Sequence, residues 1–223
     1  MTLLSPSLVR LEVPLTDSLE QMEGLGCESV HIDVCANLTI PKFFKVEELR
    51  NVHIQKYFAS ATVHVFQPFN DNPPDLTFLR NKDLAMLHVF PQTTRLTIEA
   101  FIRTSCVGGY RSGLAVDINT KIAEVLPYLS SLDTIFIVAI RAGGCCLEPD
   151  ARLLQRIKQV RLYLSENNLV CRVGIDGGIN ANTFCYLAQV ADELVVGSLL
   201  LNAKDIPSQW SKLCAMVKGG TEG

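Results

Sequence analysis

Residues 29–35 read SVHIDVC, and this stretch decides how the fold is interpreted. Three aliphatic side chains alternate here with His31 and Asp33. Neighbouring side chains of a strand point to opposite faces, so the aliphatic residues share one face and the two polar residues share the other. The pattern predicts a strand whose apolar face packs against other elements, while His31 and Asp33 point to the opposite side.

Short runs of the same β-branched kind recur along the whole chain. The other seven lie at residues 3–7, 61–66, 84–90, 112–117, 134–140, 171–176 and 193–198. Segments with helical periodicity lie between them, most clearly at 150–165, 119–129 and 180–190, each opening with a plausible capping residue. Strands that alternate with helices indicate βαβ units and a parallel sheet. About eight units predict an α/β fold of the (β/α)8 type, a TIM barrel, as a single domain over residues 1–223.

An open, doubly wound sheet is the alternative arrangement of such units. It usually carries a GxGxxG turn after its first strand, and no such turn follows residues 3–7. The length of 223 residues fits one barrel at the small end of its usual range, and no linker-type stretch divides the chain. We therefore expect the barrel, with its helices packed outside and with His31 and Asp33 facing its axis.

The composition argues against several classes of partner. The net charge is −3, and lysines and arginines are scattered in ones and twos, so we expect no nucleic-acid partner. The apolar runs at 134–140 and 193–201 are far shorter than a membrane span, and the first ten residues lack the pattern of a secretory signal. We expect a cytoplasmic protein with no membrane partner.

The spacing of the eight cysteines does not indicate a disulfide framework, and none of them belongs to a CxxC pair. The adjacent Cys145 and Cys146 lie in a predicted loop and are expected to be free thiols. Five others lie within apolar strand or helix patterns and are expected to be small buried side chains: Cys27, Cys35, Cys171, Cys185 and Cys214.

Two further polar side chains are expected at the end of the barrel where His31 and Asp33 lie. His64 lies between two valines, and Asp176 ends a run immediately before two glycines. Functional residues of such barrels lie at the carboxyl ends of the strands. Taken alone, an inward histidine is more often a core residue, and an aspartate at a strand end often caps a helix. Four such groups together favour a metal site instead, because buried carboxylates are costly unless they meet a cation. The set suits one divalent ion: Zn, Fe(II), Mn or Co.

Several of the runs resemble a known family. The motifs are SPSL at 5–8, HIDV at 31–34, VHVF with Pro68 at 63–66, LHVF at 87–90, GLAVDINT at 113–120, LPYLSSLD at 126–133, GIDGGINANT at 174–183 and ELVVGS at 193–198. Together they resemble the ribulose-phosphate 3-epimerases, in order from about residue 3 to about residue 201. The resemblance implies the ribulose-phosphate-binding type of TIM barrel and a metal-dependent enzyme that inverts the carbon next to the ketone of a sugar phosphate.

The resemblance also implies roles for individual residues. The metal ligands would be His31, Asp33, His64 and Asp176, with the two aspartates also serving as the catalytic acid–base pair. The substrate contacts would come from Ser7, from His88 and, for the phosphate, from backbone N–H groups near Gly143, Gly144, Gly177, Gly178, Gly197 and Ser198. The implied partner is a small sugar phosphate, and the implied assembly is a homo-oligomer, either a dimer or a hexamer.

The sequence departs from the family around the expected pocket. Cys35, Ala36 and Asn37 follow the HIDV motif where the family usually continues Met-Asp-Gly. Phe66 and Val138 replace methionines, Phe90 replaces an acidic residue, and the usually Gly-rich loop after the run at 134–140 begins with Arg141, which is a candidate phosphate contact. These changes leave the expected chemistry in place and alter the expected fit of the substrate.

Three functional interpretations follow. The first is a metal-dependent 3-epimerase of ribulose 5-phosphate or of a hexulose 6-phosphate such as allulose 6-phosphate, acting by proton transfer between two aspartates through an enediolate. The second is a sugar-phosphate-binding relative without turnover, which the altered loop at 141–146 favours. The third is a decarboxylase or aldolase on the same barrel, which normally needs an inward lysine; no lysine falls in a predicted strand.

Overall fold

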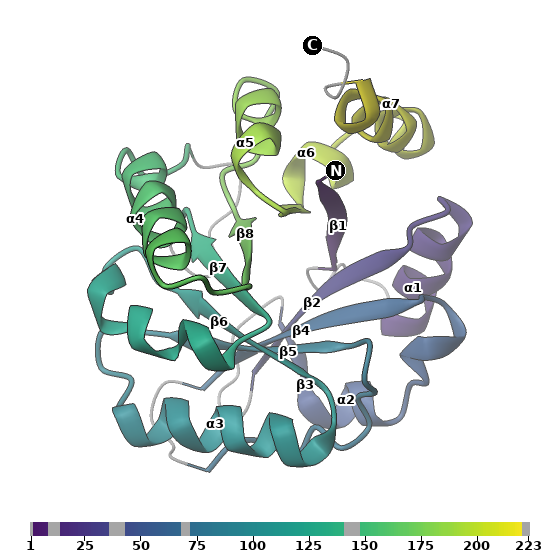
Figure 1. Ribbon diagram of the computed structural model, residues 1–223. Helices are drawn as coiled ribbons and strands as arrows, with labels where there is room; N and C mark the ends of the chain where they lie inside the picture. The colour runs from purple at the N-terminus through teal and green to yellow at the C-terminus, as the bar shows by residue number, and fades with distance from the viewer. Residues whose placement is uncertain (1, 9–13, 36–42, 68–71, 141–147, 220–223) are drawn as a thin grey trace.

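The computed structural model describes residues 2–8, 14–35, 43–67, 72–140 and 148–219. Within these residues all strands are parallel and belong to one sheet (Figure 1). They are β1 (Leu3–Leu8), β2 (Ser29–Cys35), β3 (Phe44–Lys45), β4 (Ser60–Phe66), β5 (Leu84–Val89), β6 (Arg111–Val116), β7 (Thr134–Val138), β8 (Arg172–Asp176) and β9 (Glu193–Val196). Because β1 pairs with both β2 and β9, every strand but the two-residue β3 joins a closed eight-stranded TIM barrel, as predicted.

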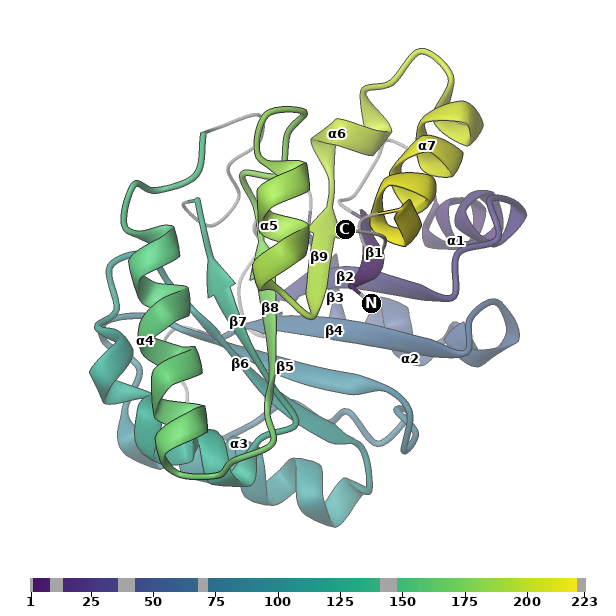
Figure 2. The same cartoon turned by 45° about the horizontal axis from the view of Figure 1, so that its top comes forward.

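Helices lie on the outside of the barrel strands (Figures 1 and 2). They are α1 (Leu15–Gly24), α2 (Val46–Arg50), α3 (Arg95–Gly108), α4 (Leu153–Glu166), α5 (Phe184–Val190), α6 (Ser198–Leu201) and α7 (Ile206–Gly219), with short 3₁₀ turns η1 (Ile54–Lys56), η2 (Ile122–Glu124) and η3 (Leu126–Ser131). Val30, Ile32 and Val34 are fully buried in the main core cluster, as the alternation in SVHIDVC predicts. None of the helices in the described parts of the chain is long and apolar enough to span a membrane.

Helical segments differ most from prediction. The segment predicted as a helix at 119–129 forms only η2 and η3, because Pro127 cannot donate a backbone hydrogen bond and favours the start of a helical turn. The helix predicted at 150–165 begins at Leu153, since Asp150 instead accepts a hydrogen bond from the backbone N–H of Arg152. The helix predicted at 180–190 begins at Phe184, after a turn held by the Asn180 side chain.

One cysteine expected to be buried is exposed, and so are two leucines of the helix predicted at 150–165. Leu154 and Leu162 on α4 lie one and two residues from buried positions, so the helical rotation of about 100° per residue turns them toward solvent. Cys185 on α5 is exposed for the same reason, being adjacent to the inward Phe184, and Cys214 is half-buried. Cys27, Cys35 and Cys171 are buried as expected, whereas Cys145 and Cys146 lie outside the described residues.

A separate apolar cluster fills the interior of the barrel below the polar mouth. It contains Leu84, Met86, Ala115, Phe136, Val138 and Val195, which come from β5, β6, β7 and β9. The ring of Phe136 lies 6.1 Å from the ring of His31, so this cluster forms the floor beneath the polar side chains. Gly174 on β8 leaves the space that the Phe136 ring occupies, because a Cβ atom there would lie 2.3 Å from its Cε1 atom.

We predict that Gly174→Ala lowers the free energy of unfolding by about 1–3 kcal/mol, the usual effect of overpacking a filled core. Gly24→Ala is the matched control, because a Cβ atom at this position would meet no other atom within 4 Å and alanine is a better helix former than glycine. Urea-induced unfolding measures both changes. Combining Gly174→Ala with Phe136→Leu should recover part of the loss; an equal loss in both backgrounds would refute this account of the interior.

Candidate metal centre and active site

Four polar side chains meet at the carboxyl end of the barrel. His31 and Asp33 project from β2, His64 from β4, and Asp176 from the last position of β8. One ligand atom from each residue lies within 4.8 Å of the corresponding atoms of the other three. The barrel therefore places all four residues of the expected ligand set in one compact group.

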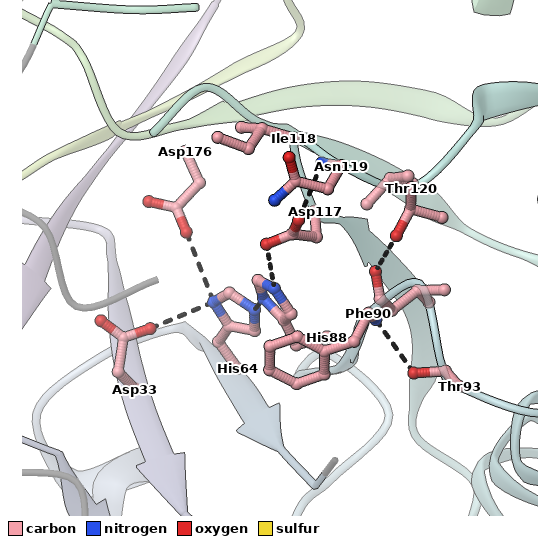
Figure 3. Close-up of polar contacts among 12 residues, drawn as sticks. Asp33, His64, His88, Phe90, Thr93, Asp117, Ile118, Asn119, Thr120 and Asp176 are labelled. Atoms are coloured by element: carbon pink, nitrogen blue, oxygen red, sulfur yellow. Dashed lines mark hydrogen bonds and ion pairs between the residues drawn. The ribbon is translucent and has the colours of Figure 1, made fainter. Parts of the chain in front are cut away.

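Figure 3 shows that Asp33 and Asp176 both contact the imidazole of His64. Its Nδ1 atom lies 3.1 Å from Oδ1 of Asp33 and 3.3 Å from Oδ2 of Asp176. The same two oxygens lie 3.3 and 3.8 Å from Nε2 of His31. Both imidazoles are fully buried, while the carboxylates keep a small exposed edge toward the barrel mouth. The two carboxylates thus approach one nitrogen from different strands.

The electrostatics of this group favour a cation. Burial lowers the pKa of the His64 imidazole, but Asp176 and Asp33 outweigh burial and raise it to about 9. Burial also acts to raise the pKa of Asp33, but the neighbouring imidazoles of His31 and His64 hold it well below its usual value. In the metal-free protein, a proton on His64 therefore compensates the two carboxylates.

A divalent metal ion fits the position of that proton. Nδ1 of His64 is buried and aims at both carboxylates, yet it makes no hydrogen bond of normal geometry within the described residues. Two imidazole nitrogens and two carboxylate oxygens are also a suitable ligand set for Zn, Fe(II), Mn or Co. Because a ligating histidine must be neutral, such an ion would displace the proton from His64.

A second polar chain extends behind His64, away from the carboxylates (Figure 3). Nε2 of His64 lies 3.0 Å from Nδ1 of His88 on β5, and Nε2 of His88 lies 3.4 Å from Oδ2 of Asp117, directly after β6. His88, a predicted substrate contact, is fully buried. Burial lowers the pKa of its imidazole, although the Asp117 carboxylate acts in the opposite direction.

Aromatic side chains cover this second chain. The ring of Phe66 stacks on His88 with centroids 4.5 Å apart, and Phe90 lies 4.3 Å from His88 on another side. Phe43 packs against Phe66 in turn, at 4.5 Å. Phe66 and Phe90, two of the positions where the sequence departs from the family pattern it resembles, thus form a hydrophobic wall beside the candidate metal ligands.

The other predicted substrate contacts lie around the same mouth. Ser7 is the register partner of His31, and a Cβ atom on Gly197 would lie 3.7 Å from the Cβ atom of Ser7. Gly177 and Gly178 follow Asp176 with φ angles of +86° and +68°, which favour glycine. Ser198 begins α6. Arg141, Gly143 and Gly144 lie outside the described residues.

The sequence interpretation assigned no role to Asp117. The alternation along the strand could have indicated it, because residues two apart point to the same face. Asp117 is two residues after the inward Ala115 on β6, just as Asp176 is two residues after Gly174 on β8. Its partner His88 could not be named from that pattern, because the contact joins different strands.

Comparisons with known proteins agree with this architecture. A family model described as the ribulose-phosphate 3 epimerase family matches residues 3–201. Ribulose-phosphate 3-epimerase of Escherichia coli (strain K12) is 22% identical over 210 residues, covering 91% of this chain and 90% of that protein. Ribulose-5-phosphate-3-epimerase, chloroplastic, of Arabidopsis thaliana is 21% identical over 218 residues, covering 91% and 73%. The Aquifex aeolicus (strain VF5) ribulose-phosphate 3-epimerase is 27% identical over 110 residues, and the match spans 49% of this chain and 50% of that protein.

Solved structures share the fold at lower identity. The 3-hexulose-6-phosphate synthase from Salmonella typhimurium superposes with a TM-score of 0.68 at 16% identity, covering 99% of this chain and 100% of that one. Mycobacterium tuberculosis tryptophan synthase gives a TM-score of 0.69 at 13% identity, covering 100% and 93%. These two show a common barrel alone. The family match is more specific, because it runs from the start of β1 to beyond β9. The chain belongs to the ribulose-phosphate 3-epimerase family.

Proposed function

We propose that this chain is a metal-dependent 3-epimerase of a ketose phosphate, either ribulose 5-phosphate or a hexulose 6-phosphate such as allulose 6-phosphate. The observation that carries the proposal is the group of His31, Asp33, His64 and Asp176 at the barrel mouth. It unites a ligand set for one divalent ion with two carboxylates on separate strands. Family membership supports the same reaction class.

Epimerisation at carbon 3 needs a base on one face of the substrate and an acid on the other. Asp33 and Asp176 come from β2 and β8, which β1 and β9 separate in the barrel, so the two carboxyl groups reach the substrate from different sides. One carboxylate removes the proton from carbon 3, and the electron pair moves to the ketone oxygen as the enediolate forms. The other carboxyl group then gives a proton to the opposite face. A divalent ion held by the four residues would act as a Lewis acid for this oxygen.

The phosphate of the substrate is proposed to lie at the turns after β8 and β9. Backbone N–H groups near Gly177, Gly178, Gly197 and Ser198 would hold it, because small residues let the backbone approach an anion closely. Ser7 would contact the substrate beside Gly197. Gly143, Gly144 and Arg141 remain predicted contributors. Three further features remain predictions: a single domain over residues 1–223, a cytoplasmic location, and a homo-oligomer that is a dimer or a hexamer.

We predict about one tightly bound divalent ion per chain after reconstitution with Zn, Fe(II), Mn or Co, because four ligands with this chemistry form a complete set. His64→Ala should lower the metal content strongly by removing the central ligand. His53→Ala is the matched control, since His53 is exposed and outside the site. Elemental analysis of the dialysed proteins measures the content. A wild-type protein without stoichiometric metal would instead favour the non-catalytic sugar-phosphate binder.

We predict that Asp33→Asn and Asp176→Asn each lower epimerisation of the preferred sugar phosphate by at least about 100-fold, the low end for general acid–base catalysis. Asp75→Asn, at an exposed ion pair with Arg50, should leave the rate unchanged. Metal content is measured in each variant, because Asp33 and Asp176 are also proposed ligands. In deuterated water the active wild type should incorporate deuterium at carbon 3. Inversion without any incorporation would contradict the two-aspartate mechanism, and binding without turnover would favour the non-catalytic relative.

We predict that Gly197→Val raises KM for the phosphorylated ketose by at least about tenfold, since a lost hydrogen bond to a charged group typically weakens binding by about 1.5–3 kcal/mol. A Cβ atom at Gly197 would lie 3.7 Å from the Cβ atom of Ser7, so the added side chain would fill space beside a proposed substrate contact. The unphosphorylated ketose is the control and should be affected much less. An equal effect on both sugars would argue against a phosphate pocket at this turn.

A further inference from the structure

The buried chain His64–His88–Asp117 extends from the metal ligands into the barrel wall. We propose that His88 and Asp117 are positioning residues of the metal centre, which hold His64 in the tautomer that leaves its Nδ1 atom available to the ion. This inference rests on the proposed metal site. It gives His88 a role different from the substrate contact that the family resemblance implies.

The direction of the hydrogen bonds follows from the geometry. When Nδ1 of His64 binds a metal, the neutral ring carries its proton on Nε2. This N–H group must donate to Nδ1 of His88, 3.0 Å away. His88 then carries its own proton on Nε2 and donates to Oδ2 of Asp117 at 3.4 Å. A carboxylate accepts but does not donate, so Asp117 selects one tautomer along the whole chain.

Other rings enclose the imidazole of His88. Its ring is fully buried, and its centroid lies 5.2 Å from that of His64 and 4.5 Å from that of Phe66. The ring centroids of His64 and Phe66 are themselves 4.2 Å apart, so the three rings form one compact cluster. Phe90 covers a further side. Both ring nitrogens of His88 are occupied, Nδ1 by the contact with His64 and Nε2 by the contact with Asp117.

Asp117 is itself held firmly. Its Oδ1 atom accepts the backbone N–H of Asn119 at 2.8 Å. The buried guanidinium of Arg156, on α4, donates to the carbonyl oxygens of Asp117 at 2.8 Å, Thr120 at 3.2 Å and Val116 at 3.4 Å. The loop that carries the carboxylate is thus fixed from the outer helix layer, which suits a residue whose role is orientation.

The other ligand histidine lacks such a brace. In the described part of the chain, Nδ1 of His31 is buried without a hydrogen-bond partner, whereas His64 has a chain of two residues behind it. Loss of His88 or Asp117 should therefore act on the metal through His64 alone. Partners of metal-binding histidines typically change metal affinity by about 10–100-fold when they are replaced.

The test compares zinc dissociation constants of four variants by competition with a chelating dye. Asp117→Asn should weaken zinc binding by about 10–100-fold, because an amide that donates to Nε2 of His88 would reverse the tautomers of both rings. His88→Phe, which keeps an aromatic ring but no nitrogen, should weaken it in the same range. His88→Gln should recover much of the affinity, since its amide can accept from His64 and donate to Asp117.

Asp133→Asn is the matched control. Its carboxylate accepts the backbone N–H of Ser112 at 2.8 Å and lies before β7, at the opposite end of the barrel. Zinc binding by this variant should equal that of the wild type. Thermal unfolding of the metal-free proteins separates a general loss of stability, which would weaken binding in all four variants alike, from the specific effect on His64.

A second measurement reads the tautomers directly. The chain has only four histidines, so long-range ¹H–¹⁵N spectra of the zinc-loaded protein can be assigned by single substitutions. We expect protons on Nε2 of both His64 and His88 in the wild type. A proton on Nδ1 of His88, or wild-type zinc affinity in Asp117→Asn and His88→Phe, would overturn this inference and leave the metal site intact. A wild type that binds no zinc, Fe(II), Mn or Co would overturn the proposed function as well.

Discussion

Two carboxylates, those of Asp33 and Asp176, converge on one imidazole nitrogen at the mouth of the barrel. Two unit charges about 4 Å apart repel each other by about 4 kcal/mol at an effective dielectric constant of about 20. Such a pair is stable only with a positive charge beside it. The two carboxylates stabilise the imidazolium form of His64, which is why the pKa of this histidine is raised. The rest of the site can be understood as the structure needed to keep these groups together.

Closure of the sheet brings the carboxylates together. Asp33 and Asp176 are far apart in the sequence, and they become neighbours because β1 pairs with β2 on one side and with β9 on the other. In an open sheet of the same strands, β2 and β8 would not meet around a common axis. The apolar floor formed by Phe136 and its neighbours keeps the polar groups at one end, where a substrate can reach them.

The sequence predicts the strands well, and also the strand positions of the four candidate ligands, because alternation along a strand is a local property. SVHIDVC contains both the buried face and the polar face of β2. Helix ends were harder to predict, since Asp150 and Asn180 form turns before their helices begin. The His88–Asp117 contact could not be predicted, because it depends on how β5 and β6 are staggered around the barrel. The sequence does not predict the preferred sugar phosphate for a related reason. Phe66 and Phe90 alter the hydrophobic wall of the site, but their identity does not specify which sugar fits against it.

Arg156 links the outer helix layer to the mouth, since its guanidinium holds the loop of Asp117 from within α4. If the guanidinium moved away with α4, the carbonyl groups that it binds would lose their hydrogen bonds. Local opening of α4 would therefore release the loop of Asp117 as well. The helix and the residues behind His64 therefore belong to one cooperative unit of local unfolding. An ion that bound more tightly to the closed unit would stabilise α4 by the same free energy. Part of the stability of this outer helix would then be set by the occupancy of a site that it never touches.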